Sequence, residues 1–284
     1  MKADCHIHMV LDGVNWKAAM DRHTPAPDEA YIHQVLATYQ RLGYTYLRDG
    51  GDKLGASAKA KQLAPQYGIT YRTPLAPLSM VGHYGGFIGL QYDSLTEYES
   101  LVLSQKAQGA DFIKIMVSGL MDFDRFGVLT ETDFPLPLLY PLVDIAHQEG
   151  LAVMVHCNGA RAMETAADAG ADSIEHGAYA DRDALCAMKE RGTVWVPTLS
   201  TVANLIVDNA PCPRHDPSVV QAILDSAIEN VTAFAQMGGL VAPGTDAGAY
   251  NVPHGSETER PLLHRCGIGD DAIDRATKQL LSLF

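Results

Sequence analysis

Short segments of strand type alternate along the whole chain with longer segments of helical periodicity. The strand-like segments fall near residues 3–8, 44–49, 69–75, 111–117, 151–156, 172–175, 193–197 and 240–245. The helical segments fall near residues 29–42, 57–67, 95–109, 137–149, 160–169, 181–191 and 217–237. Several helical segments end in glycine, the residue that commonly follows a helix. Eight units of this kind predict an α/β protein with a (β/α)8 TIM barrel.

The same alternation also fits an open, doubly wound sheet. That fold usually carries a Gly-x-Gly-x-x-Gly loop after a strand, and this sequence lacks the motif. Closure into a barrel is therefore favoured. The length of 284 residues suits one barrel, which typically takes roughly 250 residues. Because no repeat or linker interrupts the pattern, we expect a single domain over residues 1–284.

The longest irregular segments follow the carboxyl ends of strands. They cover residues 76–94, 118–135, 199–216 and 247–256. Loops at this end of a barrel carry the functional residues. We therefore expect these four segments to form the substrate pocket.

Composition narrows the class of partner. The net charge of −13 and the pI near 5.2 disfavour a nucleic-acid partner, which needs a basic surface. No apolar run reaches about 18 residues, so we expect no membrane span. Met1-Lys-Ala-Asp-Cys-His leads directly into the first strand without an apolar leader. These features predict a soluble, cytoplasmic protein that acts on a small molecule.

The five cysteines give no sign of a disulfide framework or of a cysteine zinc site. They are Cys5, Cys157, Cys186, Cys212 and Cys266, an odd number without Cys-x-x-Cys spacing. Reduced thiols are expected. Cys5 and Cys157 each adjoin a candidate metal ligand, but adjacent residues of a strand point to opposite faces.

The first strand contains a His-x-His motif, His6 and His8. Residues two apart on a strand point the same way, so both imidazoles can bind one ion. On the fourth strand the alternation sends Ile113 and Ile115 outward and Lys114 into the barrel. Burial lowers the pKa of a lysine and makes its neutral amine nucleophilic. Such an amine can take up carbon dioxide, and the carbamate can bridge two cations.

Three further candidate ligands close later strands. His156 and His176 end the fifth and sixth strands, and Asp246 ends the eighth. Each residue has a structural alternative: a hydrogen-bonded core histidine, a turn-capping Asp246 and, for Lys114, an ion pair with a barrel carboxylate. Together the set offers His6, His8 and Asp246 to one ion, His156 and His176 to a second, and modified Lys114 to both. We expect two divalent ions, with zinc favoured, holding a bridging hydroxide.

These ligands and the strings around them resemble the amidohydrolase superfamily, in the branch with a carboxylated lysine. The strings Asp111-Phe-Ile-Lys-Ile-Met-Val-Ser-Gly119, Asp172-Ser-Ile-Glu-His-Gly177, Val196-Pro-Thr-Leu199 and Pro243-Gly-Thr-Asp-Ala-Gly248 look like those of metal-dependent prolidases and related carboxypeptidases. The resemblance covers about residues 3 to 255. It implies that Asp246 is both a metal ligand and the catalytic proton shuttle, and that Lys114 is N6-carboxylated.

The resemblance also implies two residues that bind the carboxylate of the substrate. His83 follows the third strand and Tyr179 follows the strand-six histidine, which match the positions of such residues in relatives. Relatives usually carry a β-sandwich from segments before the first strand and after the eighth, and this sequence lacks both. We therefore expect a barrel alone, which favours a homo-oligomer that covers the exposed barrel surface.

The expected function is hydrolysis of an amide bond in a small carboxylate-bearing substrate, a dipeptide or an N-acyl amino acid. Phosphotriester or lactone hydrolysis is the alternative, because the same ligand set serves it. Deamination is disfavoured, because single-metal deaminases of this fold carry a glutamate shortly after the strand-five histidine, where this chain has Cys157-Asn-Gly-Ala160. A metal-binding barrel without catalysis is the remote alternative, and the retained Asp246 argues against it.

Overall fold

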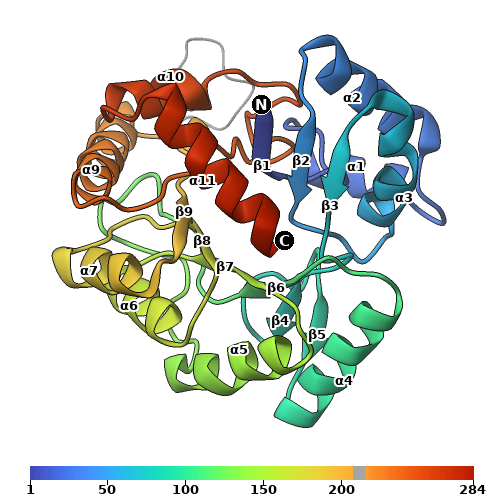
Figure 1. Ribbon diagram of the computed structural model, residues 1–284, viewed down its shortest axis with the longest axis horizontal. Helices are drawn as coiled ribbons and strands as arrows, with labels where there is room; N and C mark the ends of the chain where they lie inside the picture. The colour runs from blue at the N-terminus through green and yellow to red at the C-terminus, as the bar shows by residue number, and fades with distance from the viewer. Residues whose placement is uncertain (207–214) are drawn as a thin grey trace.

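In the computed structural model, which describes residues 1–206 and 215–284, short parallel strands stand in the centre and helices surround them (Figure 1). The strands are β1 (Ala3–Ile7), β2 (Tyr46–Asp49), β3 (Thr70–Arg72), β4 (Leu78–Met80), β5 (Leu90–Tyr92), β6 (Ile113–Met116), β7 (Val153–Cys157), β8 (Ser173–His176) and β9 (Val194–Val196). Two parallel sheets have the orders β1-β2-β3 and β5-β4-β6-β7-β8-β9.

The helices follow the strands in the predicted alternation. They are α1 (Trp16–Arg22), α2 (Glu29–Arg41), α3 (Ala56–Leu63), α4 (Leu95–Ala107), α5 (Leu139–Gln148), α6 (Ala160–Asp168), α7 (Arg182–Arg191), α8 (Ser200–Ala203), α9 (Pro217–Gln236), α10 (Glu259–Arg265) and α11 (Asp270–Leu283). Short 3-10 turns, η1 (Ala64–Tyr67) and η2 (Leu136–Leu138), adjoin α3 and α5. No helix among the described residues is long and apolar enough to cross a membrane.

A bend in the third barrel strand joins the two sheets. The segment predicted at 69–75 forms β3 only as far as Arg72, and after the bend the chain continues as β4. β3 pairs with β2, whereas β4 pairs with β6. Pro74 lacks an N–H for the ladder and Leu75 has φ of 67° at the bend. The chain therefore passes from one sheet into the other.

Backbone hydrogen bonds close the ring on the other side. The segment predicted as a strand at 240–245 is not a regular strand, and its one bridge joins Val241 to Trp195 of β9. Pro243 has no N–H to donate, which prevents a regular ladder. The segment still accepts from Cys5 N at Pro243 O (2.8 Å), and Asp246 N donates to His6 O (2.8 Å). It thus takes the place of the eighth strand between β9 and β1.

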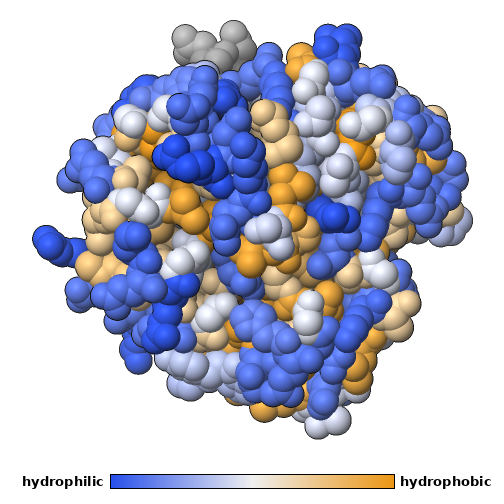
Figure 2. Space-filling model, viewed as in Figure 1, coloured by the Kyte–Doolittle hydropathy of each residue, from blue (hydrophilic) through white to orange (hydrophobic). Residues whose placement is uncertain are grey.

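The strand faces follow the predicted alternation on β6. Ile113 and Ile115 pack outward with the helices, whereas Phe112 belongs to a cluster inside the barrel. The final helix closes the amino-terminal end of the strands, where Ala276, Leu280 and Phe284 pack on that inner cluster. α11 crosses this end of the ring in Figure 1, and Figure 2 shows hydrophobic residues gathered near the middle of the same face.

Several elements were missed by the sequence pattern. β4 and β5 lie within the segment 76–94, and α8 lies within the segment 199–216, both of which the pattern predicts as irregular; the pattern also does not predict α1, α10 or α11. The signal for α11 was present, because its buried residues Ile273, Ala276, Thr277 and Leu280 recur at helical spacing. Strands of three residues are too short to show a periodicity.

Truncation of Leu280 to alanine should lower the free energy of unfolding by about 2–5 kcal/mol, because Leu280 is fully buried and its truncation opens a cavity. Leu283→Ala on the same helix is the control. Leu283 is 37% exposed, so its loss should change stability by less than about 0.5 kcal/mol. Urea unfolding followed by circular dichroism measures both, and equal effects would contradict the packing of α11 on the barrel.

Candidate metal centre

The six predicted ligands lie together at the carboxyl end of the barrel. They lie on β1, β6, β7 and β8, directly after β1, and directly after the 240–245 segment: His6, His8, Lys114, His156, His176 and Asp246. Ligand atoms of His6, His8 and Asp246 all lie within 4.8 Å of one another. The structure therefore brings residues from five separate segments to one point.

His6 and His8 converge as the His-x-His spacing predicts. Their Nε2 atoms are 3.4 Å apart, and these atoms lie 3.5 and 3.2 Å from Asp246 Oδ1. The register of β1 is irregular between Asp4 and Ile7. As a result, Cys5 packs with the inner cluster although Ile7, two residues on, packs outward with α2.

His156 and His176 form a second pair beside the first. Their ring centroids are 4.5 Å apart, and the His176 ring lies 5.0 Å from that of His6. Thr198 Oγ1 lies 2.8 Å from His176 Nδ1 and thereby orients the imidazole. Cys157 packs among the outward residues, opposite His156. Cys5, Cys157, Cys186 and Cys266 are free thiols, and Cys212 lies outside the described residues.

Lys114 points into the barrel beside the first pair. Its Nζ is 3.2 Å from His6 Nε2, and the residue is 1% exposed. Burial lowers the pKa of Lys114, against an opposing effect of Glu175 and Asp246. No carboxylate of the described residues forms an ion pair with it. The alternative, an ion pair between Lys114 and a barrel carboxylate, is therefore not found among the described residues.

Gly50, directly after β2, leaves the room that Lys114 and His8 occupy. A Cβ at this position would lie 2.8 Å from Lys114 Nζ and 2.4 Å from His8 Cε1. Gly244 plays a similar part on the other side, where a Cβ would lie 2.8 Å from His6 Cβ. Only glycine allows the backbone to approach the ligands this closely.

The donor set fits divalent metal ions. Burial lowers the pKa of His156 to about 3 and that of His6 and His176 well below the usual range, so the imidazoles are neutral lone-pair donors. His8 Nδ1 and Asp246 Oδ1 are buried without a hydrogen-bond partner among the described residues. Unpaired buried acceptors are costly, and a cation would satisfy Asp246 Oδ1. Nitrogen and carboxylate donors suit zinc.

Glu175 supports the first histidine, and sequence reasoning missed it. Its Oε2 lies 2.6 Å from His6 Nδ1, and burial raises the pKa of this carboxyl although Arg48 opposes the effect. A carboxylate on the distal nitrogen fixes the orientation of a ligand histidine. The available signal was an acidic residue at a buried position of the short strand Ser-Ile-Glu-His, directly before His176.

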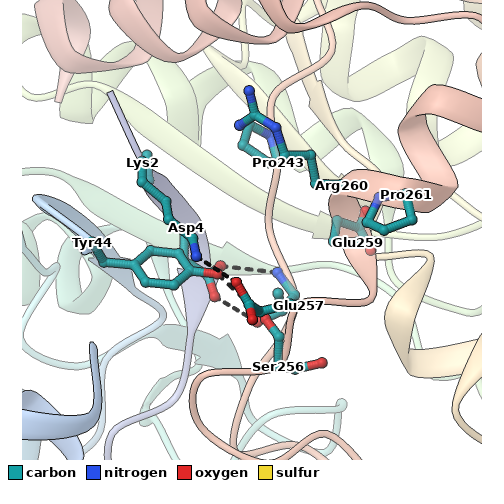
Figure 3. Close-up of a pocket in the computed structure, with 11 residues that line it drawn as sticks. Lys2, Asp4, Tyr44, Pro243, Ser256, Glu257, Glu259, Arg260 and Pro261 are labelled. Atoms are coloured by element: carbon teal, nitrogen blue, oxygen red, sulfur yellow. Dashed lines mark hydrogen bonds and ion pairs between the residues drawn. The ribbon is translucent and has the colours of Figure 1, made fainter. Parts of the chain in front are cut away.

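Asp4 holds the turn that carries Asp246. Its carboxylate accepts from Thr245 N at 2.9 Å and from Thr245 Oγ1 at 2.6 Å. Asp4 also lines a cavity of about 360 Å³ on the other side of β1, next to Tyr44 and Ser256 (Figure 3). Burial raises the pKa of Asp4 to about 7. Asp4 therefore ties β1 to the segment that closes the ring.

The backbone is strained at three residues of the centre. His176, Thr198 and Asp246 have φ of 67°, 49° and 58°, the left-handed region that side chains with a Cβ rarely adopt. Such residues cost of order 1–3 kcal/mol each and cluster at functional sites. The surrounding hydrogen bonds keep these three residues in the left-handed conformation, and this conformation sets the direction of their side chains.

A largely apolar cavity of about 440 Å³ opens above the ligands. His8, Lys114, His156, His176 and Asp246 line it, whereas His6 is fully buried. All four predicted irregular segments contribute to its wall, although residues 207–214 of 199–216 lie outside the described residues. The apolar lining comes from Leu11, Trp16, Phe87, Ile88, Met116, Leu120, Met121, Phe123, Leu205 and Ala249.

The two predicted substrate-binding residues are not among those that line this cavity. His83 Nδ1 lies 2.6 Å from Glu131 Oε1, and the same carboxylate accepts from Tyr84 N at 2.7 Å. The neighbour Tyr84 lines the cavity instead, with its ring 5.0 Å from that of His156. Tyr179 contacts Phe126 at 5.4 Å between ring centroids. Carboxylate binding by His83 and Tyr179 stays a prediction.

Comparisons with known proteins agree with this architecture. The family model described as "Amidohydrolase family" matches residues 3–278. Ochratoxinase from Aspergillus niger is 27% identical over 280 residues, covering 86% of this chain and 56% of that protein. The chain thus spans about half the length of the curated relatives it matches.

Solved structures show the same fold. A Xaa-Pro dipeptidase with bound methionine in its active site has a TM-score of 0.76 at 22% identity, covering 99% of this chain and 74% of that one. The A. niger ochratoxinase structure has a TM-score of 0.78 at 24% identity, covering 96% and 68%. The predicted TIM-barrel class is confirmed.

Gly50→Ala should displace His8 and Lys114, because the new methyl group would overlap both side chains. We expect metal content, counted by mass spectrometry after zinc loading, to fall below that of the unmodified chain. Turnover should fall by roughly a hundredfold, as expected for a misplacement near 1 Å. Gly269→Ala is the control, since a Cβ there meets nothing within 4 Å. Full metal content in Gly50→Ala would contradict the tight packing described for the centre.

Proposed function

The chain belongs to the amidohydrolase family, and from this premise we propose that it is a metal-dependent hydrolase that cleaves an amide bond. The proposed substrate is small and carries a carboxylate, as in a dipeptide or an N-acyl amino acid. The observation that carries the proposal is the convergence of His6, His8 and Asp246 with Lys114 at the floor of a cavity. The similarity to a protein named Xaa-Pro dipeptidase supports the substrate class.

We propose that His6, His8 and Asp246 hold one ion and that His156 and His176 hold the second. Lys114, as N6-carboxylysine, would contribute an oxygen to each. The burial of Lys114, its lowered pKa and its lack of an ion pair within the described residues support carboxylation. The ions, for which zinc is favoured, would supply a Lewis acid for the substrate carbonyl and an acidified water as nucleophile.

Asp246 is the proposed proton shuttle. Asp246 lines the cavity. Its Oδ1 lies 3.2 Å from His8 Nε2, but it makes no hydrogen bond within the described residues. In the proposed reaction Asp246 takes a proton from the attacking water as the new carbon–oxygen bond forms. It then returns that proton to the leaving nitrogen as the carbon–nitrogen bond breaks, so the carboxylate is regenerated. Asp246 is only 7% exposed, which limits its exchange of protons with bulk water.

The cavity supports a substrate with a bulky apolar group. Trp16 packs edge-on against Phe87 at 5.4 Å, and Phe87 lies 5.9 Å from the Tyr84 ring. This series of rings ends at the ligand His156, 5.0 Å from Tyr84. Burial of apolar substrate surface against such a wall contributes affinity of about 25 cal/mol per Å².

Lactone or phosphotriester hydrolysis is the second candidate. Within the described residues, Lys114 is the only lysine or arginine that lines the cavity. A lactone or a phosphotriester is uncharged and needs no cationic side chain for binding. The scarcity of cationic side chains in the lining therefore favours such a substrate over one that carries a carboxylate. The two candidates differ in whether the protein must bind a carboxylate of the substrate: the amide hydrolase must, and the lactone or phosphotriester hydrolase need not. Cytoplasmic location, a homo-oligomer and the absence of nucleic-acid and membrane partners stay predictions.

Asp246→Asn should lower turnover by about two to four orders of magnitude, the usual size of a lost general acid/base step. Much of the metal should remain, because asparagine still offers an oxygen. Steady-state rates on a cleaved substrate and metal counting on the same sample separate the two effects. If the variant keeps more than about a tenth of the rate, Asp246 is a ligand or a turn cap only.

A free-acid substrate should be cleaved faster than the same compound amidated at its carboxylate. Loss of a charge-assisted hydrogen bond costs about 1.5–3 kcal/mol, or roughly tenfold to over a hundredfold in kcat/KM. His83→Asn and Tyr179→Phe should shrink this preference and leave metal content unchanged. His33→Asn and Tyr67→Phe are the controls, since these two side chains pair with each other at 2.6 Å between α2 and η1, and η1 precedes β3, at the end of the strands opposite the metal centre.

The same screen includes a lactone and a phosphotriester with apolar substituents. Equal rates on the acid and its amide would remove carboxylate recognition. Turnover confined to the lactone or the phosphotriester would replace the first candidate by the second.

A further inference from the structure

A fully buried arginine lies inside the barrel beneath the metal centre. Arg48 belongs to β2 and is 0% exposed. Its Nε donates to Cys5 O of β1 at 2.7 Å, its Nη1 to Ser173 Oγ of β8 at 2.9 Å, and its Nη2 to Glu175 Oε1 at 2.8 Å. One side chain thus ties β2 to two other strands in a place where barrels usually hold branched apolar residues.

The arginine completes the support of His6. Glu175 Oε1 accepts from Arg48 and, at 2.6 Å, from Ser173 Oγ, while Oε2 faces His6 Nδ1 at 2.6 Å. Both carboxylate oxygens are therefore engaged, and the carboxylate cannot rotate without breaking a buried hydrogen bond. Because His6 Nδ1 donates to Glu175, the lone pair of the ring lies on Nε2, which faces His8 and Asp246.

Aromatic rings cover the guanidinium from the side of α11. The Phe284 ring centroid lies 4.6 Å from Arg48 Cζ and that of Phe112 lies 5.9 Å away. The two rings contact each other edge-on at 5.0 Å. This cover keeps water from competing for the guanidinium N–H groups, so these donate to Glu175, Ser173 and Cys5.

We propose that Arg48 is a positioning residue for the metal centre, which acts through Glu175 to hold His6 in its metal-binding orientation. This role rests on the metal ligands of the proposed function, and it adds a supporting residue in the amino-terminal half of the barrel interior. A guanidinium fork matches a carboxylate and the neighbouring hydroxyl in a way that the single ammonium of lysine does not. An apolar residue would leave Glu175 buried without its cation.

The test measures metal binding rather than turnover. Full-length Arg48→Met and Arg48→Lys chains are freed of metal, and their cobalt(II) affinity is measured by competition with a chelator. Arg48→Met should bind cobalt about 10- to 100-fold more weakly, the usual cost of losing a partner behind a ligand. Arg48→Lys should fall between Arg48→Met and the unmodified chain. The visible absorption of bound cobalt should also change, because the His6 imidazole is no longer held.

Arg72→Met is the matched control. Arg72 lies at the same end of the barrel and donates to Phe284 O at 3.1 Å and to Asp111 at 3.2 Å, but it does not contact Glu175. It should keep the affinity and the cobalt spectrum of the unmodified chain. Circular dichroism establishes that each variant is folded. If Arg48→Met does not fold, Glu175→Gln, which keeps the shape and loses the charge, takes its place with the same expected loss.

Two results would overturn the inference. If folded Arg48→Met binds cobalt with unchanged affinity and spectrum, Arg48 only stabilises the barrel, and the proposed function stands. If the unmodified chain binds no cobalt, the metal centre itself is wrong, and the positioning role falls with it.

Discussion

The hydrogen bond between Glu175 and His6 is the interaction on which the rest of the centre depends. It fixes which nitrogen of His6 faces the other ligands, and it requires a buried carboxylate next to them. That carboxylate requires Arg48, whose guanidinium in turn requires partners on β1 and β8 and a cover of aromatic rings. A buried ion pair is stable only when every polar atom has a partner, and here the partners come from separate strands.

The barrel interior is layered along its axis. Aromatic and apolar residues, with α11, close the amino-terminal end, the Arg48–Glu175 pair lies above them, and the ligands follow. The apolar cavity lies beyond the ligands at the carboxyl end. Low polarity on both sides strengthens the electrostatic interactions of the middle layers. This arrangement leaves the carboxyl end as the side on which the ligand residues border a cavity.

Close backbone approach is the second requirement of the centre. Gly50 and Gly244 allow two strand ends to press against ligand side chains, and His176 and Asp246 occupy left-handed conformations. These features cost stability locally and are maintained by the surrounding packing and by clamps such as Asp4 on Thr245. Local backbone strain therefore accompanies the orientation of the ligand side chains, as is typical of functional sites.

The sequence alone determined the alternating architecture and placed six candidate ligands on strands or directly after them, because periodicity and the position of a residue relative to its strand are local properties: His6, His8, Lys114, His156, His176 and Asp246. Only the tertiary structure decided what surrounds them. Arg48 and Glu175 are 127 residues apart, and no local pattern carries such a pairing. The bend after β3, the irregular eighth segment and the closure by α11 likewise depend on which segments meet. Periodicity predicts whether a segment forms a helix or a strand, whereas contacts between distant segments decide which side chains become partners.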